Sequence, residues 1–204
     1  MKEHPIIFNT EMVKAILEGR KTQTRRVIDP QIPYNPTSVS GRKWGKIDGS
    51  FWYCGVKFPY GQVGDRLWVR ETWQLWDYVS NQHILRPSAC NKISERICYK
   101  AECSHDLKWR SPYHMYRWTS RTTLEITNVR VERLQEIKNT ELFMEGRSAK
   151  DDIYVEYGKY KNAKKWFIEL WNSIHKKEHR WEDNPWVWVI SFKRLNSHLD
   201  QKEK

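Results

Sequence analysis

The sequence predicts an α+β fold built on a small β-barrel with flanking helices and long loop insertions. Strand-like and helical stretches are mixed along the chain and do not alternate as regular βα units. In the clearest strand-like stretch, residues 122–133, the apolar residues move from even positions (Leu124, Ile126) to odd positions (Val129, Val131). Such a one-residue slip is typical of a β-bulge or a turn, and bends of this kind close small barrels.

The first elements surround Lys21 and Thr24. An apolar run at residues 5–8 suits a buried strand, and apolar residues at helical spacing predict a helix over residues 11–18. Residues 22–28 have the composition of a strand. If the turn after the helix stays helical, Lys21 and Thr24 share a face, whereas in a strand they point to opposite faces.

The remaining elements are expected from apolar periodicity and helix-capping residues after residue 60. A strand covers residues 66–73, a short helix ends at Glu145 near the surface, and an amphipathic helix surrounds residues 166–174. The final strand, residues 186–192, is apolar on both faces. We therefore expect it in the interior of the sheet.

Three stretches without a sustained period interrupt these elements, at residues 29–60, 76–112 and 147–161. They are rich in turn-forming or polar residues, which is typical of loops and insertions. We interpret them as insertions in a single domain that covers residues 1–195 and is followed by a polar tail, residues 196–204.

The charge of the chain favours a polyanionic partner. Lys and Arg number 36 against 25 Asp and Glu, so the net charge is +11. With 12 Trp and 10 Tyr available for stacking, RNA or a modified nucleoside is the leading partner, although core packing accounts for most aromatics. The sequence lacks an apolar run of membrane-spanning length and a signal-peptide core, so we expect a cytoplasmic protein without a membrane partner.

A zinc site is a weak alternative to reduced thiols. Cys90, Cys98, Cys103 and His105 could be read as a zinc knuckle, but the spacing lacks a CxxC pair. Cys54 lies apart from them. We therefore expect free cysteines, no metal and no cofactor.

Most candidate binding residues are cations next to aromatic residues. The stretch 19–26 concentrates four cations, and residues 113–121 combine aromatics with arginines, a composition that suits a phosphate and a stacked base. Solvated arginines on a rim of packed aromatics are the alternative. The candidate binding residues are Arg20, Arg25, Arg26, Trp68, Arg70, Glu71, Arg117, Trp118 and Arg121.

Glu71 has two interpretations. It is in phase with the apolar residues Leu67, Val69 and Trp73 of the predicted strand, so its carboxylate should be buried. Burial would raise its pKa and make it a candidate acid. The alternative is a structural ion pair with one of the many arginines.

Four motifs occur in order along the chain: residues 16–26 (Ile-Leu-Glu-Gly-Arg-Lys-Thr-Gln-Thr-Arg-Arg), 64–71 (Gly-Asp-Arg-Leu-Trp-Val-Arg-Glu), 134–146 (Leu-Gln-Glu-Ile to Glu-Gly) and 184–189 (Asn-Pro-Trp-Val-Trp-Val). Together they resemble the ASCH domain family, and especially the longer form that phages and prophages carry. The resemblance covers residues 5–194. It implies a PUA-like β-barrel with a cleft that faces nucleic acid.

The resemblance also implies an activity. A small bacterial member of the family is an amidohydrolase that removes the acetyl group from N4-acetylcytidine with a Lys, a Thr and a Glu. Carried over to the matching positions, these residues are Lys21 as general base, Thr24 as nucleophile and Glu145 as proton donor to the leaving amine. A Thr hydroxyl needs such a base, and a Lys can serve only if its pKa falls toward neutrality.

The neighbouring arginines leave the choice of function open. Arg20, Arg25 and Arg26 would lower the pKa of Lys21, because like charges disfavour the ammonium form. The same arginines could instead hold a phosphate or an acyl oxyanion. A non-catalytic module that binds RNA or modified DNA is the main alternative to an amidohydrolase, and a nuclease that uses the same cleft is a third possibility.

Overall fold

The computed structural model describes residues 1–29, 31, 45–47, 50–53, 56–77, 82–83, 95–103, 107–147 and 159–195. Its strands are β1 (Glu3–Ile7), β2 (Gln23–Val27), β3 (Gly45–Ile47), β4 (Ser50–Tyr53), β5 (Val56–Lys57), β6 (Arg66–Arg70), β7 (Trp73–Asp77), β8 (Gln82–His83), β9 (Glu95–Tyr99), β10 (Thr123–Arg133) and β11 (Trp186–Leu195). The helices are α1 (Thr10–Leu17), α2 (Asn139–Met144) and α3 (Lys159–Ile174), and short 3-10 turns include η2 (Pro112–His114), η3 (Arg117–Thr119), η4 (Leu134–Glu136) and η6 (Trp181–Asp183).

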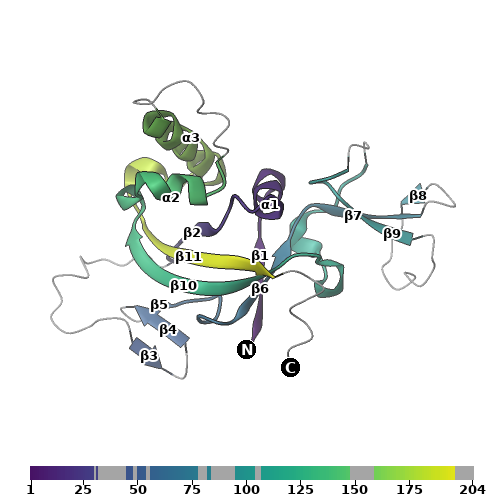
Figure 1. Ribbon diagram of the computed structural model, residues 1–204, viewed down its shortest axis with the longest axis horizontal. Helices are drawn as coiled ribbons and strands as arrows, with labels where there is room; N and C mark the ends of the chain where they lie inside the picture. The colour runs from purple at the N-terminus through teal and green to yellow at the C-terminus, as the bar shows by residue number, and fades with distance from the viewer. Residues whose placement is uncertain are drawn as a thin grey trace.

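A five-stranded mixed sheet in the order β1-β6-β10-β11-β2 forms the body of the protein (Figure 1). β1 runs parallel to β6, and the other neighbours are antiparallel. The α+β class is therefore confirmed. The described strands are not closed into a barrel, however, because the edge strands β1 and β2 do not pair with each other.

The phase slip in β10 is a register shift against β11. Ile126 pairs with Phe192 and Asn128 pairs with Ser191, so Thr127 is the extra residue of the pair. The predicted slip near this position is confirmed. Its effect is a bend in the two longest strands, which curve together across the sheet without closing it (Figure 1).

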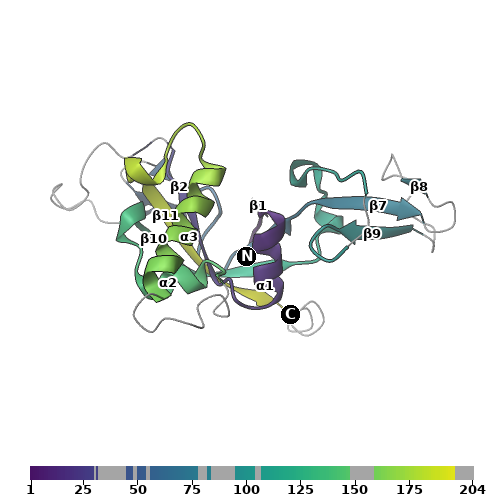
Figure 2. The same cartoon turned by 90° about the horizontal axis from the view of Figure 1, so that it is seen from above.

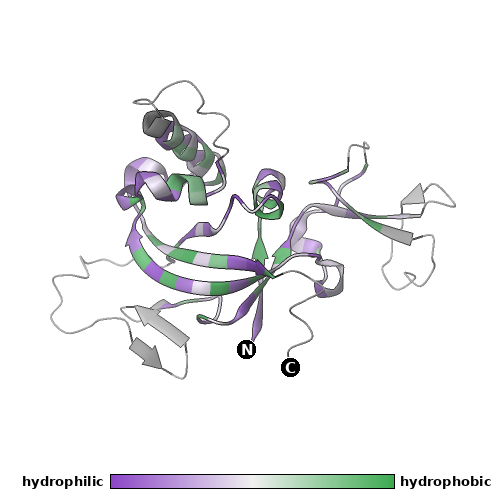
Figure 3. Ribbon diagram, in the orientation of Figure 1, coloured by the Kyte–Doolittle hydropathy of each residue, from purple (hydrophilic) through white to green (hydrophobic). Residues whose placement is uncertain are grey.

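The apolar pattern of the long strands and helices forms two adjoining cores. Figure 3 shows apolar and polar residues alternating along β10. One core packs α1 against β1, β6, β10 and β11, and the other packs α2, α3 and η6 against β11. β11 lies between β10 and β2 and is buried on both faces over residues 186–190, as predicted.

Two of the predicted insertions contain small sheets. β3, β4 and β5 form one within residues 29–60, and β7, β8 and β9 form the other around residues 76–112. Most of these strands are short, with two to four residues in β3, β4, β5 and β8, so they show no sustained apolar period. Figure 2 shows the second sheet extending away from the body. Most of the predicted insertion 147–161 and the tail 196–204 lie outside the described residues.

The described helices are short or amphipathic. None of them is both long and apolar enough to cross a membrane.

Candidate functional site

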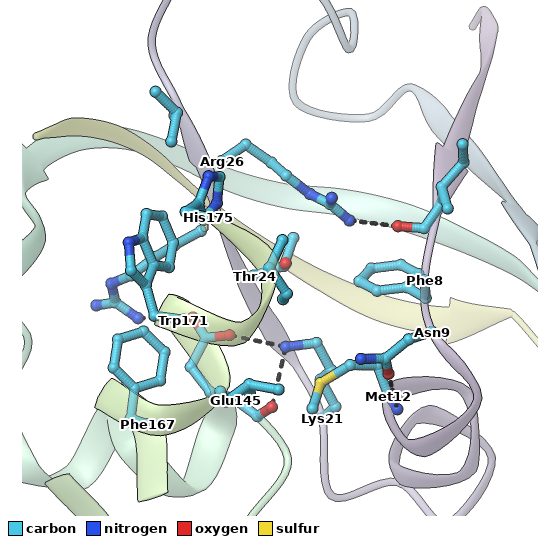
Figure 4. A pocket seen from close by; sticks show the side chains of 15 residues that line it. Phe8, Asn9, Met12, Lys21, Thr24, Arg26, Glu145, Phe167, Trp171 and His175 are labelled. Atoms are coloured by element: carbon cyan, nitrogen blue, oxygen red, sulfur yellow. Dashed lines mark hydrogen bonds and ion pairs between the residues drawn. The ribbon is translucent and has the colours of Figure 1, made fainter. Parts of the chain in front are cut away.

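A cavity of about 280 Å³ lies between β2, the ends of β1 and α2, the start of α1 and one face of α3 (Figure 4). Its polar lining comes from the basic stretch after α1 and from the end of α2, and its apolar lining comes largely from α3. The lining residues are Ile7, Phe8, Asn9, Met12, Lys21, Thr24, Arg25, Arg26, Val27, Glu145, Phe167, Leu170, Trp171, Ile174 and His175. The predicted Lys21, Thr24 and Glu145 are therefore brought together.

Lys21 reaches the cavity because the chain reverses sharply after α1. Gly19 has a φ of 75°, and the Lys21 N–H then donates to the Ala15 carbonyl at 3.0 Å. Lys21 also forms an isolated antiparallel bridge with Glu145. Gly146, with a φ of 107°, permits this approach, because a Cβ there would lie 2.9 Å from Ala15 Cβ.

Lys21 and Glu145 form a buried ion pair. Lys21 Nζ donates to Glu145 Oε2 at 2.7 Å and to the Glu145 carbonyl at 2.9 Å. Desolvation by burial lowers the pKa of Lys21, and the neighbouring Glu145 carboxylate opposes that shift. The expectation that Glu145 lies near the surface is wrong, since it is only 3% exposed. The bridge to Lys21 draws the end of α2 inward.

Thr24 lies in β2, and its side chain faces the same cavity. The segment is a strand, as its composition predicted, yet Lys21 and Thr24 do not diverge to opposite sides. Lys21 precedes the regular part of β2, which starts at Gln23, so the alternation of the strand does not extend to it. Within the described residues, the Thr24 hydroxyl takes part in no hydrogen bond. It is therefore available to a ligand.

Arg25 is held by carboxylates. Its guanidinium donates to Glu145 Oε1 at 2.7 Å, to Glu141 Oε2 at 2.7 Å and to Glu132 Oε1 at 2.5 Å. Arg130 contacts Glu132 and Glu141 from the other side. With Lys21, these groups form a network of three cations and three carboxylates. Arg25, predicted to bind the ligand, is instead occupied with positioning Glu145.

Arg20 and Arg26 behave differently from Arg25. Arg20 is not among the residues that line the cavity, and it contacts Glu18 and the Gly146 carbonyl. Arg26 lines the cavity, donates to the Ile7 carbonyl at 2.6 Å and lies 5.1 Å from the centre of the Phe8 ring. Its Nε is buried and has no partner among the described residues. Arg26 is thus the arginine with a donor to spare at the site.

The helix α3 supplies a wall that was not predicted as part of the site. Its apolar face was expected to pack on the sheet, and Phe167 and Trp171 do belong to the core, but both also line the cavity. His175 stacks on Trp171 with 4.3 Å between ring centroids. Burial lowers the pKa of His175, and nearby His179 and Arg26 act in the same direction. The i, i+4 spacing of Trp171 and His175 was the available signal.

Glu71 forms a second buried ion pair away from the cavity. Its carboxylate accepts from Arg121 Nε at 2.9 Å and Nη2 at 3.1 Å. Arg121 also contacts Glu102 at 2.5 Å and lies 4.0 Å from the centre of the Tyr99 ring. Burial raises the pKa of Glu71 against the opposing effect of Arg121. Of the two interpretations of Glu71, the geometry therefore agrees with the structural ion pair. The Glu71 carboxylate is hydrogen-bonded to Arg121, and Arg121 is also paired with Glu102.

The other predicted binding residues gather outside the cavity. Arg70 and Arg117 lie 4.7 and 6.0 Å from the Trp68 ring, respectively. Trp118 is 54% exposed and stacks with Tyr116 at an interplanar angle of 16°. Arg117 pairs with Glu3 at 2.7 Å, with both side chains partly in solvent. Trp68 is itself buried, with 8% exposed, and Arg70, Arg117 and Trp118 form a surface that is distinct from the cavity.

The predicted zinc ligands are only partly described. Cys98 is buried and Cys103 is half-buried, whereas Cys54, Cys90 and His105 lie outside the described residues. Across the described ranges, no group of three or more His, Cys, Asp or Glu side chains is placed to hold a metal ion.

Comparison with known proteins yields one structural likeness. No family model matches the sequence, and no curated protein matches it. A solved structure, the high-resolution crystal structure of an ASCH domain from Lactobacillus crispatus JV V101, is similar with a TM-score of 0.38 and 13% identity, over 95% of this chain and 79% of that chain.

Proposed function

We propose that the cavity is the active site of an amidohydrolase that removes the acetyl group from N4-acetylcytidine or a nucleic-acid base modified in the same way. The observation that carries the proposal is the meeting of three residue types in one buried cavity. A Lys with a lowered pKa, an unbonded Thr hydroxyl and a carboxylate that holds the Lys all line it. The motif resemblance to the ASCH family supports the same activity.

The first half of the reaction transfers the acetyl group to Thr24. The neutral Lys21 amine takes the proton of the Thr24 hydroxyl, and Oγ1 attacks the carbonyl carbon of the acetamide. The bond from that carbon to the exocyclic nitrogen then breaks. The nitrogen takes the proton from the Lys21 ammonium, which releases cytidine and leaves an acetyl ester on Thr24.

The second half returns Thr24 to its hydroxyl form. Water attacks the ester carbon and gives a proton to Lys21. The ester bond breaks, Thr24 Oγ1 takes that proton, and acetic acid leaves and ionises in solution. Arg26 lines the cavity, and we assign its guanidinium to stabilise the oxyanion in both halves.

Glu145 acts in this scheme by holding Lys21. Both oxygens of its carboxylate accept hydrogen bonds from cations, one from Lys21 and one from Arg25. We therefore assign delivery of the proton to the leaving nitrogen to Lys21 rather than to Glu145. Burial favours the neutral amine that must act as base, and the Glu145 carboxylate stabilises the ammonium that must act as acid.

Release of cytidine from N4-acetylcytidine by the purified protein tests the proposal. Thr24→Ala and Lys21→Met should each reduce turnover by at least about a hundredfold, the scale of a lost nucleophile or base. Thr22→Ala is the matched control, because Thr22 is exposed and two residues from Thr24. Turnover that survives Thr24→Ala would overturn the acyl-transfer mechanism.

A non-catalytic binding module is the second candidate. The observation that favours it is the ion pair of Lys21 with Glu145, because the carboxylate stabilises the ammonium form of Lys21, which cannot accept a proton. In that case the cavity holds a modified base and no bond breaks. Tight binding of N4-acetylcytidine without release of cytidine, and with equal affinity in Thr24→Ala, would establish this alternative.

A further inference from the structure

We propose that a single-stranded polynucleotide is the substrate, and that its nucleotides next to the modified base bind a strip of residues that leads from the cavity to Tyr116 and Trp118. The strip consists of Ile7, Arg70, Trp68, Arg117, Tyr116 and Trp118. The proposal rests on the proposed function of the cavity. It adds the class of substrate and the surface that recognises it.

The strip starts at the cavity itself. Ile7 lines the cavity and is 40% exposed, and it pairs in register with Arg70 in the parallel β1–β6 pair. Residues paired in this way share a sheet face, as do residues two apart in one strand. Ile7, Arg70 and Trp68 therefore lie on one face, opposite the buried Ile6 and Val69.

The middle of the strip carries cations around an aromatic ring. Arg70 makes a cation-π contact with Trp68 and has no ion pair in the part of the chain that the structure describes. Arg117 approaches the same ring, and its pair with Glu3 is half in solvent, where such pairs contribute little. Both guanidinium groups are thus available to phosphates.

The far end of the strip is a pair of exposed rings. Tyr116 and Trp118 are 46% and 54% exposed, and their centroids are 6.1 Å apart at an angle of 16°. The segment is fastened to β6, because Ser120 Oγ donates to the Val69 carbonyl at 2.8 Å. In Figures 1 and 2 the teal turns of this segment lie beside β1 and β6. The two rings are held in place rather than left on a loose loop.

The chemistry of the strip selects an unpaired strand. Exposed rings stack on bases whose faces are open, and the neighbouring guanidinium groups contact the backbone, whereas a duplex hides the base faces. The net charge of +11 favours the same partner. A free nucleoside would use the cavity alone.

The test compares one acetylated cytosine in two contexts. The value of kcat/KM is measured on free N4-acetylcytidine and on a single-stranded RNA of nine nucleotides with N4-acetylcytidine at its centre, for wild type and Trp118→Ala. We expect the RNA to be the better substrate by about tenfold or more. Trp118→Ala should reduce the value on RNA by about fivefold or more, the effect of one lost stacking contact, and leave the value on the nucleoside unchanged.

Matched variants separate the strip from general effects. Tyr113→Ala removes another exposed ring of the same segment, whose ring contact is with His114, and should leave both values unchanged. Arg70→Ala should lower the salt dependence of RNA binding, and Lys165→Ala, an exposed cation on α3, should not. Equal kcat/KM on RNA and nucleoside, with no effect of Trp118→Ala, would overturn the proposal.

The two proposals fail separately. If neither substrate is turned over, the proposed activity has failed, and binding of fluorescein-labelled single-stranded RNA and DNA of the same length decides the role of the strip. Binding that weakens about fivefold or more in Trp118→Ala supports a role of the strip in binding. Whichever of the RNA and the DNA binds more tightly is then the expected natural polymer. Binding that is unchanged in Trp118→Ala, or equal for a duplex, overturns it.

Discussion

Glu145 and Glu71 are two buried carboxylates in similar ion pairs, but only one of them borders a cavity. Each accepts from an arginine at 2.7 or 2.9 Å, and each is less than 4% exposed. Glu145 also holds Lys21 and faces the space that Thr24 lines. The Glu71 carboxylate accepts from Arg121, the Glu71 backbone N–H donates to the sulfur of Met115, and Glu71 is not among the residues that line the cavity.

The difference shows that burial of an acid is not enough to mark a functional site. In the Glu71 pair, the chain itself occupies the hydrogen-bonding capacity of the acid and its arginine, with Tyr99 and Glu102 closing the group. Beside Glu145, Lys21 and Thr24, whose hydroxyl makes no hydrogen bond within the described residues, line the cavity. The raised pKa of Glu71 therefore belongs to a structural ion pair. The lowered pKa of Lys21 belongs to a group that lines the cavity and can contact a ligand.

The largest expected effect is on stability and concerns the two arginines. Arg25→Met removes the cation shared by the buried Glu145 and the half-buried Glu132 and Glu141, and it should lower the free energy of unfolding by about 3–5 kcal/mol. Arg121→Met should cost less, because Arg121 is partly exposed and Glu71 can take up a proton. Urea denaturation at neutral pH measures both. An equal loss of unfolding free energy in Arg25→Met and Arg121→Met would contradict the stronger structural role that we give to Arg25.

The second effect separates the two acids by activity. Glu145→Gln should lower kcat/KM on N4-acetylcytidine by about a hundredfold, because Lys21 loses the carboxylate that stabilises its ammonium form. Glu71→Gln should change it less than about twofold, since surface and structural changes away from a site leave transition-state binding intact. A larger loss in Glu71→Gln would place that acid in the mechanism.

A third effect concerns the pH dependence of turnover. A general base must be neutral, so kcat/KM should rise with pH through the lowered pKa of Lys21, which lies below its ordinary value of 10.5. Burial lowers this pKa and Glu145 raises it, so Glu145→Gln should move the rising limb to lower pH. The residual activity of the variant, measured across the pH range, checks the direction. A shift to higher pH would contradict the assignment of the limb to Lys21.

The smallest effect is the pH dependence of stability at Glu71. The pKa of Glu71 is raised above its ordinary value of 4.5, chiefly by desolvation. Its protonated form therefore contributes stability that is fully present below pH 4.5 and is lost as the pH rises through the raised value. In Glu71→Gln this decline should disappear from urea midpoints measured from about pH 4 to pH 7. An unchanged decline would assign it to other groups.

The elements that depend on local pattern could be predicted from the sequence. The helix after residue 10, the slip at Thr127 and the interior position of β11 follow from apolar periodicity, and the strand that contains Thr24 follows from its composition. The closure of the sheet could not be predicted, because it depends on whether two edge strands meet in space. The strands β3, β5 and β8 were missed because they are too short to show a period, whereas the alternation of Trp73 with Leu75 in β7 and of Ile97 with Tyr99 in β9 was an available signal.

The residues of the site could be predicted from the sequence, but the side chains that contact them could not. The motif indicated Lys21, Thr24 and Glu145, but the burial of Glu145 depends on the bridge between residues 21 and 145, which are distant in sequence. Arg25 was expected to face a ligand, and only the fold reveals the three carboxylates that surround it. The α3 wall was hidden because its apolar face serves both core and cavity.

Capture of the acetyl group on Thr24 tests the central claim most directly. The protein is mixed with N4-acetylcytidine, quenched in acid within the first turnover and digested, and the peptides are examined by mass spectrometry. We expect one added acetyl group on the peptide that contains Thr24, and none in Thr24→Ala. Release of cytidine at the wild-type rate by Thr24→Ala, with no acetylated peptide in either protein, would contradict the assignment of this cavity as an acyl-transfer site.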